Sequence, residues 1–508
     1  MSITNNQDKK IKKDKNKIYV YYSLYIISMF IKKTRKLKKT RKSQKIKGTR
    51  KMGGKVIASG GYGCVLDPVL KCNNSSRASI RDGIRGSIRA DITNSSNSSN
   101  SSNSNNNSST NHMVTKLLLR RNAATEYANV KKFKELLDSI PNFSNYFLLD
   151  DFTMCVPAKL SSTDMVDFDV KCKALQKQSI TRANVNESLS KLRAINMPSG
   201  GKDVGDYIYA EDLDYLKMNQ LNSALLDLLR NGIIPMNNKQ VYHCDIKESN
   251  VLASIDKSRM FAKLIDWGIS AHYTGKKKIP PTMVGRPFQY NTPFSTVLFN
   301  KHFIQMYKNF LKTTPNPDDD AIAAFVNTYV LYWVNRRGIG HLKSMNTIFK
   351  NVDADKTYDD MQYFGEDILK YQHAYSYIFK YLTDILIEYT NKKSKKMELL
   401  KYFTEVYLKN IDVWGFTMIY LPIMEYLQYN LSILNRYELK IVETIKKMIL
   451  LLVENSAEPI DIAKLMVYIA KLPDLFTNAN TLREQGPVQL VNSKKKVKIP
   501  TKIMSTSS

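Results

Sequence analysis

The chain has 508 residues, of which 43% are hydrophobic, and its formal net charge at pH 7 is +31. This apolar content is near the globular norm, so a sizeable core is expected, and the length suits two to four domains or one two-lobed domain with insertions. The five cysteines are odd in number and form no C-x-x-C pair. This argues against a zinc site and a disulfide framework and predicts a reducing, intracellular environment.

The N-terminal leader, residues 1–51, carries 18 Lys and Arg against two Asp, which is about half of the net charge. Its uncharged stretch, residues 18–31, has 14 residues, whereas a membrane-spanning helix needs about 20. We expect a poorly ordered basic leader; the alternative is an anchor in the interface of an anionic membrane. The charge favours an acidic protein, a nucleic acid or an anionic membrane as partner.

The periodicity of the chain predicts several ordered elements. Residues 55–70, "KVIASGGYGCVLDPVL", alternate like a strand pair around a glycine turn. Residues 121–140 have helical spacing and end before a proline, and residues 213–233 form an amphipathic helix ending at Gly232. From about residue 300 onward, aromatic and aliphatic helices are expected, without a strand-rich region.

Two segments have compositions that predict disorder. Seventeen of the 18 residues in 94–111 are Ser or Asn, and such a run cannot bury enough apolar surface to offset the entropy of ordering. The C-terminal residues 483–508 end in "SKKKVKIPTKIMSTSS" and are expected to be a disordered basic tail.

The stretch "VYHCDIKESNVL", residues 241–252, places His243, Asp245, Lys247 and Asn250 within eight residues between apolar flanks. Downstream, Asp266 in "KLIDWGIS" ends an apolar run. The oxygens of Asn250 and Asp266 suit a hard cation such as Mg²⁺ (or Mn²⁺). Asp245 would orient and deprotonate a hydroxyl, and Lys247 would balance the charge of a transferring phosphoryl group. For Asp245 alone a loop-capping role is the commoner explanation, but the full set indicates phosphoryl transfer.

This constellation resembles the protein-kinase catalytic loop H-R-D-x-K-x-x-N followed by a D-F-G-like metal element. Residues 58–65, "ASGGYGCV", match the kinase glycine loop G-x-G-x-x-G-x-V except at the first glycine, although a lone glycine loop is more often a hairpin turn. The resemblance implies that these residues approach the phosphates of ATP. The residues concerned are Ala58, Ser59, Gly60, Gly61, Tyr62, Gly63 and Val65.

Further positions extend the resemblance. Lys116 in "HMVTKLLL" would contact the α- and β-phosphates, and Glu126 on the next helix would pair with it; taken alone, each reads as a surface residue. Residues 196–201 resemble the hinge between the lobes, where Asn196 and Met197 would read adenine through backbone groups. Asp412 in "NIDVWGF" resembles the carboxylate that braces the catalytic loop from below.

Finer features are similar to the serine/threonine-type kinases of large nucleocytoplasmic DNA viruses, among them "INMPSGGKD", "KLIDWGIS" and "GRPFQYNTPFS". The family implies an α+β, bilobal fold with a small β-rich N-lobe over residues 52–198 and a large α-helical C-lobe over 199–482. A helical insertion would occupy about 300–405. The family also implies ATP and a protein substrate, and a location in the host cytoplasm or the virion.

Some positions depart from the family pattern. Cys244 replaces the Arg of H-R-D, which normally binds an activation-loop phosphate, and Trp267 replaces the Phe of D-F-G. "RPFQYNTPF" stands where A-P-E is expected. Three functions therefore remain open: an ATP-dependent protein kinase acting on Ser/Thr, a catalytically weak kinase-fold scaffold that binds anionic partners through its basic tails, and a small-molecule kinase. The filled base, lysine and metal positions favour the first.

Overall fold

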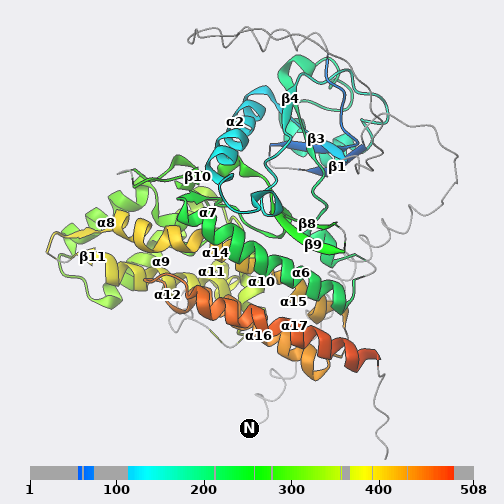
Figure 1. Cartoon of the computed structure of the whole chain (residues 1–508). Helices are drawn as coiled ribbons and strands as arrows, with labels where there is room; N and C mark the ends of the chain where they lie inside the picture. Colours follow the sequence, from blue (N-terminus) through cyan, green and yellow to red (C-terminus); the bar gives the residue numbers. More distant parts are fainter. Residues whose placement is uncertain are drawn as a thin grey trace, which may run out of the picture. The chain divides into compact units, whose positions relative to one another are not determined.

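The structure of the protein is a computed structural model, which describes residues 55–59, 62–73, 112–210, 213–256, 258–275, 278–354, 356, 366–391, 393–431 and 433–484 (Figure 1). All of these belong to one structural unit, Gly53–Ser508. The leader 1–51, Gly60, Gly61, the Ser/Asn segment 94–111 and the tail from residue 485 lie outside the described residues. The expectations for these parts stay predictions.

An antiparallel sheet of five strands, in the order β1-β2-β3-β5-β4, forms the N-terminal part of the described chain. Its strands are β1 (Lys55–Ser59), β2 (Gly63–Asp67), β3 (Met113–Leu119), β4 (Thr153–Cys155) and β5 (Leu192–Pro198). The β1–β2 pair confirms the strand pair predicted from the alternating residues. β3 pairs with β5 along its full length, which places Lys116 opposite Ile195.

Helix α2 (Arg120–Leu137) follows β3 directly and confirms the helix predicted before Pro141. Its buried side chains recur at helical spacing and are Ala123, Glu126, Val130, Phe133 and Leu137. The one carboxylate in this otherwise apolar row, Glu126, faces β3. The helix therefore brings a buried acid to the strand that carries Lys116.

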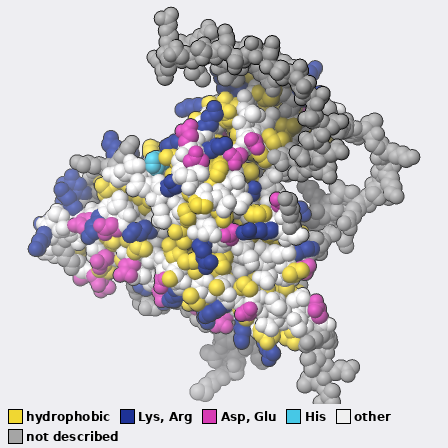
Figure 2. Space-filling model, viewed as in Figure 1, with side chains coloured by type: hydrophobic (Ala, Val, Ile, Leu, Met, Phe, Trp, Pro, Cys, Tyr) yellow, Lys and Arg dark blue, Asp and Glu magenta, His cyan; other side chains and the backbone are white. Residues whose placement is uncertain are grey.

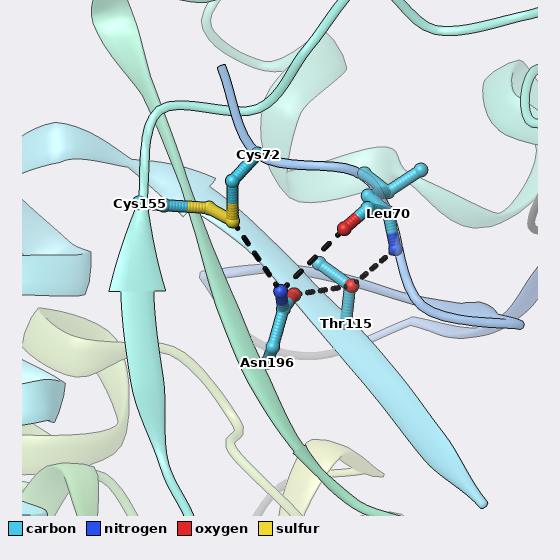
Figure 3. The surroundings of a disulfide bond; sticks show 5 residues. All are labelled: Leu70, Cys72, Thr115, Cys155 and Asn196. Carbon is cyan, nitrogen blue, oxygen red and sulfur yellow. Dashed lines mark hydrogen bonds between the residues drawn. A yellow bond between two sulfur atoms is a disulfide. The ribbon is translucent and has the colours of Figure 1, made fainter. Parts of the chain in front are cut away.

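Two disulfides in this region overturn the expectation of a chain without a disulfide framework. Cys64 on β2 is joined to Cys172, with Cα atoms 5.0 Å apart, and Cys72 is joined to Cys155 on β4, with Cα atoms 5.7 Å apart (Figure 3). The partners are separated by 108 and 83 residues, so local spacing gave no sign of the pairing. Cys244 is the free cysteine that makes the count odd. The inference of a reducing environment from that count has therefore lost its basis.

Two small ladders frame the loops that carry the polar constellation. β7 (Val241–Tyr242) pairs with β10 (Ala271–His272), and β8 (Val251–Asp256) pairs with β9 (Arg259–Leu264) and with β6 (Lys202–Asp203). The loop 243–250 thus runs from β7 to β8, and the loop 265–270 runs from β9 to β10. Each loop is fixed at both ends by hydrogen-bonded strands, and the two loops lie beside each other.

The helix predicted to end at Gly232 continues beyond it. After α5 (Val204–Ile208), helix α6 (Tyr215–Asp227) passes into a π-helical turn, Leu228–Ile233, and then into α7 (Ile234–Asn238). Pro235 lies in the first turn of α7, and Ile234 just before it donates its backbone N–H to the carbonyl oxygen of Leu229. A Cβ at Gly232 would lie 2.9 Å from the Cβ of Tyr146. The glycine therefore serves close packing and does not end the helix.

The rest of the described chain is mostly helical, as predicted. Further short helices of the described part are α3 (Phe168–Lys171), α4 (Lys173–Gln176), α11 (Glu366–Leu369) and α13 (Leu399–Tyr402). The longer helices after residue 300 are α8 (Lys301–Thr313), α9 (Asp319–Arg337), α10 (Leu342–Val352), α12 (Gln372–Tyr389), α14 (Leu408–Met418), α15 (Leu421–Asn430), α16 (Arg436–Glu454) and α17 (Ile462–Glu484). One short strand pair, β11 (Thr390–Asn391) with β12 (Lys396–Met397), interrupts them. The described part is thus of the α+β class.

Packing divides the described apolar side chains into one large core and smaller clusters. The large core runs from Phe133 on α2 to the C-terminal helices, while a separate cluster around Val56 and Phe168 fills one side of the sheet. Helix α17 contacts both α6 and α16, and α12 contacts α9 and α10 (Figure 1). None of the helices in the described part combines the length and apolar character that spanning a bilayer requires.

Candidate active site

Three charged side chains, from β3, from α2 and from the loop after β9, meet at one point. Lys116 Nζ on β3 lies 2.7 Å from Glu126 Oε1 on α2 and 3.3 Å from Asp266 Oδ1. Burial by itself lowers the pKa of Lys116, but the carboxylates of Asp266 and Glu126 outweigh it and raise the pKa above its usual value. Burial likewise raises the pKa of Asp266, but Lys116 outweighs it and the pKa is lowered. The lysine therefore carries its charge in the core.

Asp266 and Trp267 are held in place by backbone conformation and aromatic packing. Asp266 has a φ of +67°, a left-handed conformation that is uncommon for residues other than glycine. Trp267 is buried, with its ring centroid 5.4 Å from that of Phe133 on α2 and 5.0 Å from that of His243. The indole thus occupies the space beneath α2 while the side chain of Asp266 remains 35% exposed.

A buried carboxylate fixes the start of the loop 243–250. Asp412 on α14 accepts hydrogen bonds from the backbone N–H of His243 at 2.9 Å and of Cys244 at 2.8 Å. Burial raises the pKa of Asp412 to about 7, against the lowering effect of these two donors and of Arg286. His243 Nε2 lies 2.9 Å from the carbonyl oxygen of Ile265. Both loops are therefore tied to each other and to α14.

The carboxylate of Asp245 is surrounded by hydrogen-bond donors. Its Oδ2 accepts from Lys247 Nζ at 2.9 Å and from Asn250 Nδ2 at 3.1 Å, and its Oδ1 accepts from Asn291 Nδ2 at 2.8 Å. Asn250 Nδ2 also donates to the Asp245 carbonyl at 2.8 Å. The hydrogen bonds of Asn250 to Asp245 use its N–H groups, which leaves its amide oxygen as an acceptor for a cation.

A cavity of about 420 Å³ lies between strands β1, β2 and β3 on one side and the loops 243–250 and 265–270 on the other. Many predicted site residues line it: Ala58, Val65, Lys116, Glu126, Met197, Lys247, Asn250 and Asp266. Apolar side chains such as Val114, Leu148 and Leu252 complete the wall. The lining of the cavity therefore combines apolar side chains with charged and amide groups.

Other predicted residues lie elsewhere. Tyr62 is 54% exposed and is not among the residues that line the cavity. Gly63 lies on β2, where a Cβ would come within 2.1 Å of the Leu117 carbonyl oxygen. The side chain of Asn196 accepts a 2.6 Å hydrogen bond from Thr115 Oγ1 and lies 3.6 Å from Cys72 Sγ, among the residues around the disulfide (Figure 3). Ser59 belongs to β1.

Two residues that sequence reasoning missed contact the loop 243–250. Asn291 binds Asp245, and Arg286 Nη1 donates a 2.8 Å hydrogen bond to the carbonyl oxygen of Cys244. Both lie in the stretch "GRPFQYNTPFS", for which the sequence predicted no contact with this loop. The one signal was an arginine within a mainly uncharged stretch, and spacing alone does not connect it to a loop 40 residues earlier.

Charge on the described surface is mixed. On the face shown in Figure 2, Lys and Arg side chains are interspersed with Asp and Glu. Within the described residues there is also no group of three or more His, Cys, Asp or Glu side chains that could hold a metal ion. A cation bound by Asn250 and Asp266 would therefore need further oxygen ligands from a nucleotide and water.

Comparisons with known proteins add little. No protein-family model matches the chain, and no curated protein matches its sequence. Among solved structures, the kinase PK-1 of Cydia pomonella granulovirus is similar over 49% of this chain, with 13% sequence identity and a TM-score of 0.22. The match spans 63% of that kinase, which is less than two thirds of its length. So low a TM-score leaves the functional question to the geometry of the site.

Proposed function

We propose that the protein is an ATP-dependent protein kinase that transfers the γ-phosphate to Ser or Thr of protein substrates. The observation that carries the proposal is the buried Lys116, paired with Glu126 and Asp266 in the cavity that Asn250 and Lys247 also line. Phosphoryl transfer requires a lysine that is held by an acid, an acid and an amide that can bind a cation, and a separate carboxylate.

Each part has a role that follows from its position. The apolar side chains of the lining, among them Met197 and Val114, suit adenine, and Lys116 would contact the phosphates. Asn250 and Asp266 would hold Mg²⁺ or Mn²⁺, which neutralises phosphate charge when bound. The donor set fits, because both side chains offer oxygen to a hard cation and Asp266 is partly exposed.

Asp245 is positioned to orient the accepting hydroxyl. Its Oδ2 accepts from both Lys247 and Asn250, whereas its Oδ1 accepts one hydrogen bond among the described residues, from Asn291. A carboxylate oxygen accepts about two hydrogen bonds. The free position on Oδ1 would therefore receive the proton of a substrate Ser or Thr hydroxyl, while Lys247 supports the transferring group.

The alternative is a kinase-fold scaffold with weak catalysis. It is supported by Ala58 at the first position of the glycine loop and by the basic leader. The complete set of charged groups around the cavity favours transfer.

The test is incubation of the full chain with labelled ATP and a mixture of basic and acidic protein substrates, with Mg²⁺ and Mn²⁺ compared. We expect label on serine and threonine. Nucleotide binding without transfer would favour the scaffold, and label on tyrosine or on a small metabolite would overturn the substrate assignment.

A further inference from the structure

We propose that Arg286 is a positioning residue: anchored by Trp333 of α9, it clamps the loop 243–250 so that Asp245 is held ready without an activating phosphate. This inference rests on the proposed function for its consequence in catalysis. The effect of Arg286 on the mobility of the loop 243–250 does not depend on catalysis and can be tested separately.

The clamp acts on a residue with an unfavourable backbone. Cys244 has a φ of +66°, and a non-glycine residue keeps such a conformation only where its surroundings enforce it. Its N–H donates to Asp412 Oδ1 at 2.8 Å and its carbonyl oxygen accepts from Arg286 Nη1 at 2.8 Å. Both backbone polar groups of Cys244 are thus held, from α14 on one side and from the segment after Asp266 on the other.

Arg286 is held in turn by its own neighbours. Its side chain is only 10% exposed, and its Nε donates to Gln289 Oε1 at 2.8 Å. Its carbonyl oxygen accepts a 3.1 Å hydrogen bond from the indole Nε1 of Trp333, a buried residue of α9. The guanidinium therefore has one well-defined position, set partly by the helical region 300–405.

The same segment is fastened at three further points. The N–H of His341 donates to the carbonyl oxygen of Phe288 at 2.9 Å, and Trp414 Nε1 on α14 donates to that of Tyr290 at 2.8 Å. Asn291 Nδ2 then binds both Asp245 Oδ1 and the carbonyl oxygen of Ile246, at 2.8 and 3.2 Å. Residues 286–291 thus connect the helical region to the catalytic carboxylate through buried and partly buried hydrogen bonds.

A cation next to Asp245 is therefore supplied by the chain itself. Arg286 Nη2 lies 3.9 Å from Asp245 Oδ1, although Cys244 replaces the Arg of H-R-D in the sequence. Because this guanidinium is already bonded to Cys244 and Gln289, its position does not depend on a phosphate. The region 300–405 gains a role: its helix α9 keeps the segment in place.

Three variants and a control test the clamp. Arg286→Ala removes the guanidinium, and Arg286→Lys keeps a positive charge on a single donor nitrogen. Trp333→Phe removes the N–H that anchors Arg286, together with part of a buried ring. Arg336→Ala removes an exposed arginine of α9 and is the control. Each is compared with the wild-type full chain by amide hydrogen exchange over residues 242–250, by ATP affinity and by steady-state transfer.

For Arg286→Ala we expect faster exchange in the loop, unchanged ATP affinity and a kcat lowered about 100-fold, because small misplacements of a reacting group cost about this much. The exchange rates and kcat values of Arg286→Lys and Trp333→Phe should lie between those of Arg286→Ala and those of the control. Millimolar guanidinium, which can enter the vacated space, should restore part of the protection and of the rate in Arg286→Ala alone.

The two proposals fail in different ways. If the wild type transfers phosphate but Arg286→Ala and Trp333→Phe match the control in exchange and kcat, the clamp is wrong and the kinase assignment stands. If no protein transfers phosphate but exchange rises in Arg286→Ala and Trp333→Phe, the clamp stands and the kinase assignment is wrong. A general rise in exchange over the whole chain would also contradict a local clamp.

Discussion

Single residues at the site illustrate how burial and pairing work against each other. Lys116 is buried, which disfavours its charge, yet two carboxylates within 3.3 Å keep it protonated. Asp266 depends on the same pair, since Lys116 is its principal charged neighbour in the described structure. Removing one member of a buried charged group leaves the others without compensation.

Asp266→Asn should therefore lower the Mg²⁺-dependent transfer rate by about two to three orders of magnitude, because the only carboxylate proposed to bind the cation becomes neutral. Asp256→Asn, at the exposed end of β8, is the control and should behave as the wild type. The check is the transfer rate as a function of Mg²⁺ concentration. A wild-type rate in Asp266→Asn would refute the metal assignment.

His243 predicts a loss of stability in acid. Burial lowers the pKa of this histidine in the folded protein, whereas the unfolded chain titrates near 6.5. Below that pH the unfolded chain binds more protons than the folded one, so acidification favours unfolding. The loss of stability that His243 causes should be absent above about pH 7 and should grow as the pH falls below about 6.5.

The measurement is the melting temperature of wild type and His243→Gln at pH 7.5 and 5.5. The wild type should lose more stability on acidification than the variant, whose side chain can still donate to Ile265. Half-buried His341 and buried His373, whose pKa values burial also lowers, account for a remaining slope. Equal losses in both proteins would count against the role of His243.

At the scale of elements, the segment 278–294 is fixed by the chain around it. Arg286 and Asn291 bind the loop 243–250, and contacts from α9 and α14 hold the segment itself. A switch needs two states of similar free energy that a modification can distinguish. Here the contacts that a phosphate would create are already made by protein groups.

Protein produced in a bacterial host and treated with phosphatase should consequently keep most of its transfer rate. The check is a comparison of the rate before and after the treatment, with phosphate content measured by mass spectrometry. A hundredfold fall that is reversed by rephosphorylation of a Thr or Tyr in residues 267–294 would show that the segment is a switch after all.

The disulfides connect elements of the sheet region to distant parts of the chain. Cys72–Cys155 closes a loop of 83 residues that includes the Ser/Asn segment. Cross-linking a loop of this length restricts the unfolded chain and stabilises the fold by about 2–5 kcal/mol.

Replacing both Cys72 and Cys155 by Ser should lower the free energy of unfolding by about this amount. Addition of a reductant should lower the melting temperature of the wild type more than that of the double variant, which has already lost one cross-link. Equal sensitivity to reductant would mean that this bond does not contribute in solution.

For the molecule as a whole, sequence reasoning succeeded where the signal is local. Periodicity predicted the β1–β2 pair and α2, because alternation and helical spacing depend on neighbouring residues. The spacing of Asp245, Lys247 and Asn250 along one loop also placed them together, whichever function they serve.

What the sequence did not reveal depends on contacts between distant residues. The cysteine pairs, the bond from Arg286 to Cys244 and that from Asn291 to Asp245 join residues 42 to 108 positions apart. The π-helical turn before Pro235 was missed because a glycine followed by a proline commonly ends a helix, whereas here Gly232 is required by the proximity of Tyr146.

The central claim, that the cavity and the loop 243–250 form a phosphotransferase site, is tested most directly by Asp245→Asn. The measurement is the single-turnover rate of phosphate transfer from saturating labelled ATP with Mg²⁺, together with ATP affinity, for the full-length wild type and this variant. We predict measurable transfer by the wild type, a rate about 100-fold or more lower in Asp245→Asn, and equal ATP affinity. Equal transfer rates in the two proteins, or ATP binding without any transfer by the wild type, would contradict the account.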